Sequence, residues 1–194
     1  MRRQSLFMLV NGIFLIVPVI TWLMGLLDLR QMGFATPTFF SFALGILLGA
    51  SCIPLSYYPM RFVILKRNIE IPWIEKPRSS FKRMIPFLLV GAIVEELFFR
   101  GFLVSLVLPL GLVWVVMISS FAHYFGHFLN PGFRLIENTA DKMLAASGWF
   151  LTAIMLAVLF IYSKSLIPVV IAHSFASIGF GWMMTARTEG RVPR

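Results

Sequence analysis

Long apolar runs separated by short polar stretches dominate the chain. A bilayer core takes about 20 apolar residues per helix, and backbone exposed to lipid must form its hydrogen bonds internally. We therefore predict membrane-spanning helices near residues 5–27, 36–59, 84–108, 111–129, 147–163 and 165–186. This pattern predicts an all-α fold, a polytopic membrane protein with about six transmembrane helices in one membrane domain, 1–194.

Composition agrees with a bilayer environment. The chain is 59% hydrophobic and only 13% charged, with a mean hydropathy of +0.87. A soluble domain of this length has too few charged residues to cover so much apolar surface. We expect the first run to be a retained signal anchor, because it is too long for a cleaved signal peptide. The pair Gly45 and Gly49 has the spacing that lets two membrane helices approach closely.

The positive charge has a sided distribution. Lys and Arg number 17 against 8 Asp and Glu, which gives a net charge of +9. With the N-terminus inside, 14 of the 17 basic residues fall in the N-terminus, 60–83, 130–146 and the C-terminal tail. This bias predicts that both termini are cytoplasmic and that the basic residues contact anionic lipid headgroups, not nucleic acid. The basic segment 60–83 is interpreted either as an interfacial segment or as an ordinary inner loop.

Three charged residues stand inside the third predicted span. They are Glu95, Glu96 and Arg100. Each ionised side chain at the centre of a membrane helix costs about 2.5–3.5 kcal/mol on insertion scales, so packing alone does not account for three. Glu96 and Arg100 are four residues apart, share a helix face and can pair. Glu95 is rotated by about 100° and faces elsewhere, which indicates a second, functional carboxylate.

All three histidines also fall in predicted spans. At 1.5 Å per residue, Glu95 lies about 17 Å from the inner face and His173 about 12 Å from the outer face, nearly the same depth. On the same estimate His123 lies about 18 Å and His127 about 24 Å from the outer face, so depth favours His123. A carboxylate close to imidazoles is a minimal set of groups for activating a water molecule.

Two motifs then suggest a family. The segment Glu95–Arg100 has the form E-E-x-x-x-R and is followed by Gly101. The segment Ser119–His127 fits a second motif, F-x-x-x-H preceded by a Ser-Ser pair, with His127 as the motif histidine. In that frame His123 occupies the position of the phenylalanine. These motifs resemble those of the CAAX-protease and bacteriocin-processing (CPBP, or Abi) family of glutamic-type intramembrane proteases.

The third family motif, H-x-x-x-N, is only partly present. His173 matches it, but Ser177 replaces the asparagine. The resemblance covers residues 84–186, the motif-bearing core, while 1–83 add two spans and the basic segment.

The resemblance implies a site. Glu95 would be the general base for the hydrolytic water, with His127 helping to hold or deprotonate it. His173 would stabilise the oxyanion, with Ser177 in place of the usual amide donor. Glu96 and Arg100 would orient the site. Whether His123 replaces or supplements His127 stays open.

The function implied is an endopeptidase that cuts a peptide bond at or near the membrane. The substrate would be a peptide or membrane protein, possible targets being C-terminal sorting or anchor segments, and the location a bacterial inner membrane. A catalytically inactive Abi-type immunity or scaffold protein is one alternative, and a small proton or ion transporter is another, although no repeat supports transport. A zinc-dependent mechanism is a further alternative, but the chain contains no H-E-x-x-H motif. We expect no cofactor and no metal.

Overall fold

The computed structural model describes residues 2–69, 78–128 and 135–186, and these residues form helices and connections without a β-strand. The all-α prediction is confirmed. In chain order the elements are α1 (Arg2–Leu23), α2 (Phe39–Arg67), α3 (Arg78–Glu96), a π-helix η1 (Leu97–Val104), α4 (Ser105–Val107), a 3-10 turn η2 (Leu108–Leu110), α5 (Leu112–His127), α6 (Thr139–Ser163) and α7 (Leu166–Ala186).

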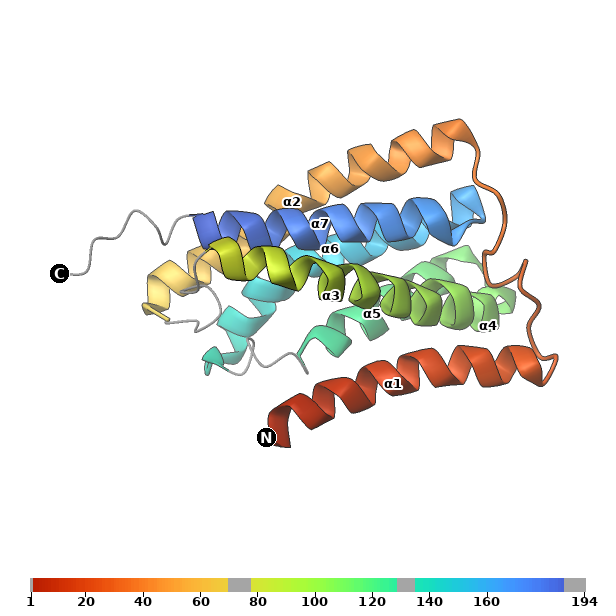
Figure 1. Ribbon diagram of the computed structural model, residues 1–194, viewed down its shortest axis with the longest axis horizontal. Helices are drawn as coiled ribbons and strands as arrows, with labels where there is room; N and C mark the ends of the chain where they lie inside the picture. The colour runs from red at the N-terminus through yellow and green to blue at the C-terminus, as the bar shows by residue number, and fades with distance from the viewer. Residues whose placement is uncertain (1, 70–77, 129–134, 187–194) are drawn as a thin grey trace.

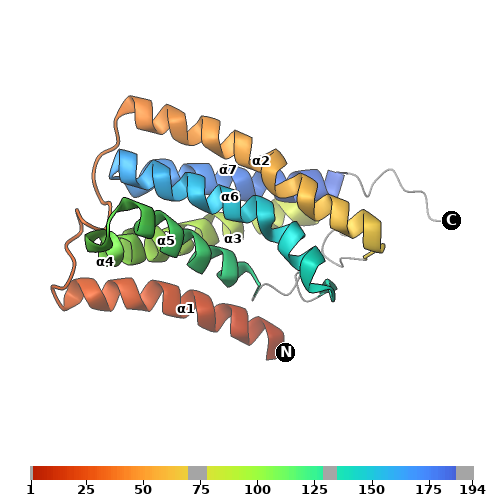
Figure 2. The same cartoon turned by 180° about the vertical axis from the view of Figure 1, so that it is seen from behind.

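The long helices lie along one common axis and alternate in direction (Figure 1). Helices α6 and α7 pack along α2, and α5 packs on α6 (Figure 2). Helix α1 lies at the edge of the bundle, where it packs against η1 and α3. The start of α1 and the end of α7 lie at the same end of the bundle (Figure 1). The connections that contain Arg30 and Lys164 lie at the opposite end.

Three of these helices are long and apolar enough to cross a membrane. They are α2, α6 and the segment Leu166–Met184 of α7. Shorter apolar helices cover Leu9–Leu23 and Leu112–His127. The chain is thus a membrane protein, and the count of six spans stays a prediction.

Two predicted boundaries are wrong by about two turns. Helix α2 does not end near residue 59 but continues to Arg67, so the first part of the basic segment 60–83 is helix. Met60, Val63 and Ile64 are buried in this extension and hold it against the bundle. The helix stops at Asn68, which adopts the left-handed conformation with φ of 49°. Residues 70–77 of the same segment lie outside the described residues.

Helix α6 begins at Thr139 instead of near 147. The side chain of Asn138 caps it by accepting a hydrogen bond from the backbone N–H of Asp141. The buried Asp141 carboxylate pairs with Lys66 and Arg67 at the end of α2. Hydropathy does not reveal this start because the first turn is polar, and its partners come from a distant part of the sequence.

Glycines allow α2 to approach its two neighbours closely. A Cβ at Gly45 would lie 2.6 Å from the backbone oxygen of Pro168, and one at Gly49 would lie 2.8 Å from that of Ala172, both on α7. The close approach predicted from their spacing is confirmed. A Cβ at Gly148 of α6 would lie 1.8 Å from the carbonyl oxygen of Leu55 on α2. Backbone cannot move away as a flexible side chain does, so this third contact requires glycine.

The contact at Gly148 generates a stability prediction. We expect Gly148→Ala to destabilise the protein by more than about 1 kcal/mol, because the added methyl overpacks the α2–α6 contact. The matched control is Gly12→Ala, whose Cβ meets nothing within 4 Å. In the control, helix propensity makes alanine neutral or up to about 1 kcal/mol stabilising. Thermal unfolding in detergent micelles measures both, and equal melting temperatures for the two variants would contradict the close contact.

Candidate active site

The guanidinium of Arg100 is completely buried and connects three parts of the bundle. One terminal nitrogen, Nη1, donates to Glu96 Oε1 at 3.0 Å and lies 2.7 Å from His123 Nδ1 on α5. The other, Nη2, donates to the carbonyl oxygen of Ala153 on α6 at 2.9 Å. The flat, multi-donor guanidinium suits such a branched contact, which a lysine ammonium would not reproduce.

Arg100 lies within a π-helix, not in the continuous α-helix expected over 84–108. π-Helical turns are rare and frequently occur at functional sites. In η1 the carbonyl oxygen of Phe99 accepts a hydrogen bond from the buried Ser119 hydroxyl at 3.3 Å. The ring of Phe99 also stacks on His123, with 4.7 Å between ring centroids. Helix α5 therefore contacts both the backbone and the side chain of Phe99 in the π-helix.

Glu96 is the carboxylate that Arg100 neutralises. The ion pair expected from the four-residue spacing is present, and both side chains are fully buried. The same oxygen, Oε1, lies 2.6 Å from His173 Nδ1 on α7. Glu96 therefore connects the guanidinium to the imidazole of His173, and both partners stabilise its charged form.

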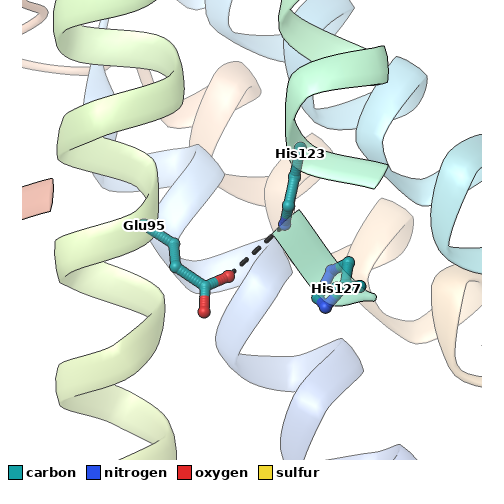
Figure 3. Close-up of side chains that lie close together, drawn as sticks. All are labelled: Glu95, His123 and His127. Atoms are coloured by element: carbon teal, nitrogen blue, oxygen red, sulfur yellow. Dashed lines mark ion pairs between the residues drawn. The ribbon is translucent and has the colours of Figure 1, made fainter. Parts of the chain in front are cut away.

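Glu95 points toward His123 on α5 (Figure 3) and also lies near His173 on α7. Its Oε2 atom lies 3.4 Å from His123 Nε2 and 3.7 Å from His173 Nε2. The side chain is 22% exposed, yet Oε2 itself is buried and has no hydrogen-bond partner among the described residues. Both separations exceed a normal N–H···O hydrogen bond of about 2.7–3.2 Å. A carboxylate oxygen thus lies between two ring nitrogens without direct bonds to either.

His127 lies one turn further along α5 (Figure 3). Its ring stacks on His123 at 4.8 Å and meets the edge of Trp149 at 4.1 Å. The structure therefore places His123, not His127, directly between Arg100 and Glu95, as the depth estimate suggests and the motif frame does not. Ser177, one turn after His173, is half-buried and makes no hydrogen bond with the described site residues.

Three groups at the site were not identified from the sequence. The Ser-Ser pair belongs to a sequence motif, but the motif does not reveal that Ser119 donates a hydrogen bond to the backbone of η1. Trp149 has no sequence pattern that connects it to His127. The Ala153 carbonyl has no signal at all, because every residue carries one.

Glu95, His123 and His127 offer ligand atoms that all lie within 4.8 Å of one another, as a metal site requires (Figure 3). A metal needs a lone pair on each ligand nitrogen. Arg100 has only N–H donors, so the Nδ1 of His123 must accept its hydrogen bond. In the neutral ring the proton is then on Nε2, the atom nearest Glu95. That nitrogen has no lone pair to give, so this trio fits a metal poorly.

These observations define a membrane protein with a buried centre of carboxylates and imidazoles contributed by α3, α5 and α7, the group types of a water-activating hydrolase. Residues 77–179 match the family described as type II CAAX prenyl endopeptidase Rce1-like. The match covers more than half of the chain, and the chain belongs to this family of hydrolases, which confirms the CPBP resemblance. No curated protein and no solved structure matches the chain.

The hydrogen bond to η1 predicts different effects for two adjacent serines. We expect Ser119→Ala to cost about 1 kcal/mol, because it removes a buried hydrogen bond to the π-helix. For a chain of this size that corresponds to about 2–4 °C in melting temperature. Ser120 is equally buried, but its hydroxyl has no partner among the described residues. Ser120→Ala is therefore the control, and its melting temperature should not fall. Melting curves in micelles measure the difference, and a larger loss for Ser120→Ala would argue against the assigned bond.

Proposed function

We propose that this protein is a glutamate-dependent intramembrane endopeptidase in which Glu95 is the general base. The supporting observation is the position of the Glu95 carboxylate, whose buried Oε2 lies 3.4 Å and 3.7 Å from two imidazole nitrogens without a hydrogen bond of its own. A water bound at this carboxylate can lose a proton to it and attack a peptide carbonyl.

The two glutamates differ in their availability as a base. Glu96 is fully buried and its Oε1 is bound to Arg100 and His173, so a proton on this carboxylate would leave the buried guanidinium without its counter-charge. Glu95 has no Arg or Lys partner among the described residues and remains partly exposed. Glu95 is therefore the base, while Glu96 and Arg100 position the histidines.

The substrate class follows from where the site lies. The base is on α3, which packs on α7, a helix long and apolar enough for a membrane, so we expect the scissile peptide to come to the bilayer. The family description names a CAAX prenyl endopeptidase. For this chain we propose C-terminal sorting or anchor segments of membrane proteins, cut in a bacterial inner membrane with both termini of the enzyme in the cytoplasm. The basic residues would hold anionic lipid headgroups.

One observation supports a different function. Ser177 stands where the family motif has asparagine, and it makes no hydrogen bond with the described site residues. An inactive Abi-type immunity or scaffold protein would tolerate this loss. Such a protein would keep its cellular phenotype when Glu95 is replaced, whereas a peptidase would lose it.

The peptidase proposal predicts the effect of one isosteric change. Glu95→Gln removes the base without changing the size of the side chain, and we expect at least about a 100-fold loss of cleavage rate. The assay uses protein in liposomes with a quenched fluorescent peptide that ends in a prenylated CAAX sequence. In parallel, mass spectrometry compares the C-termini of membrane proteins in cells that express the wild type or the variant.

The matched control is Glu137→Gln, an exposed glutamate just before α6, which should leave the rate unchanged. The melting temperature of Glu95→Gln should match that of the wild type, so that lost cleavage is not lost folding. Wild-type cleavage that survives Glu95→Gln would remove Glu95 from the mechanism. Loss of cleavage on adding a metal chelator would favour the zinc-dependent alternative.

A further inference from the structure

The two histidines beside Glu95 are held by partners of opposite kind. His123 Nδ1 lies 2.7 Å from Arg100, whose guanidinium can only donate. His123 therefore accepts at Nδ1, and its single proton is on Nε2, 3.4 Å from the Glu95 carboxylate. Protonating Nδ1 as well would place an N–H against the guanidinium. His123 thus presents a fixed donor to the site and has no means of taking up a second proton.

His173 has the reverse arrangement. Its Nδ1 lies 2.6 Å from Glu96 Oε1, and that carboxylate is ionised because it pairs with the buried Arg100. An ionised carboxylate can only accept, so the proton of His173 is on Nδ1. Its Nε2 then carries a lone pair, 3.7 Å from Glu95 Oε2. A carboxylate bonded to one ring nitrogen, as Glu96 is to Nδ1, also stabilises the imidazolium that forms when Nε2 takes up a proton.

We propose that the two histidines divide the proton chemistry: His123 donates to the oxyanion, and His173 carries the proton to the leaving nitrogen. This inference rests on the proposed function of Glu95. It differs from the roles implied by the sequence motifs, in which His127 assists the water and His173 stabilises the oxyanion.

The steps balance. Glu95 takes a proton from water as the water oxygen bonds to the peptide carbon, and the carbonyl electron pair moves onto its oxygen, which His123 Nε2–H stabilises. The proton passes from Glu95 to His173 Nε2. The C–N bond then breaks, its electron pair stays on nitrogen, and His173 protonates that nitrogen. The products are a carboxylic acid and an amine, and both side chains return to their starting states.

This division also accounts for Ser177. An oxyanion donor on α5 takes over the task that the family motif gives to an asparagine on α7. The serine at this position then costs the reaction little.

Glutamine substitutions separate the two roles. In His123→Gln, Arg100 would bind the amide oxygen and turn the NH₂ group toward Glu95, so the donor is retained. We expect this variant to stay within about tenfold of the wild type with an unchanged pH profile of kcat/KM, while His123→Ala loses about 100-fold or more. In His173→Gln, Glu96 would take the NH₂ group and leave a carbonyl that cannot relay a proton. We expect His173→Gln and His173→Ala to lower kcat/KM equally, by about 100-fold or more.

The opposite ranking, with His173→Gln active and His123→Gln as impaired as His123→Ala, would overturn the proposal. A second measurement does not depend on activity or on the folding of any variant. Nitrogen NMR of wild-type protein with ¹⁵N-labelled histidine rings should show an unprotonated Nδ1 in His123 and a protonated Nδ1 in His173. The reverse tautomers would refute the inference even if Glu95 proves essential. Activity without Glu95 would refute the proposed function and with it the proton route, although the two tautomers could still be as assigned.

Discussion

A cation buried among apolar helices must be neutralised and hydrogen-bonded, and this constraint organises the centre of the protein. Arg100 meets it with contacts to Glu96, His123 and the carbonyl of Ala153. Each contact has a consequence: Glu96 is kept ionised, one histidine is left with its proton facing the site, and α6 is joined to α5 and η1. Removing one partner of a buried ion pair typically lowers the free energy of unfolding by about 3–5 kcal/mol. We therefore expect the loss of Glu96 or Arg100 to disturb the other contacts as well.

The apolar core leaves room for this polar layer by dividing into two clusters. One cluster, which includes Tyr57, Val63 and Met184, fills the end of the bundle where α1 starts. The other, which includes Val115, Leu159 and Val169, fills the opposite end. The glycine contacts bring α2 close to α6 and α7. Glu95 lies within this bundle and still keeps a partly exposed side chain.

Helix boundaries show where hydropathy stops being informative. Both misplaced ends, Arg67 and Thr139, are polar turns that pack on each other through Asp141. Each looks like loop when taken alone, because the charge that stabilises it lies some 75 residues away. The π-helix is hidden for a related reason: its amino acids suit an α-helix equally well, and the hydroxyl that bonds its backbone belongs to α5.

The sequence by itself determined the membrane class, the all-α fold, the family and the Glu96–Arg100 pair, because these depend on run length, motifs and local spacing along one helix. Only the tertiary structure decided which histidine lies against Glu95 and which group each imidazole meets at its Nδ1. A ring's tautomer is set by what bonds its other nitrogen, and for both His123 and His173 that partner comes from a different helix. Local pattern along one helix cannot encode such a contact, which exists only when the helices are packed.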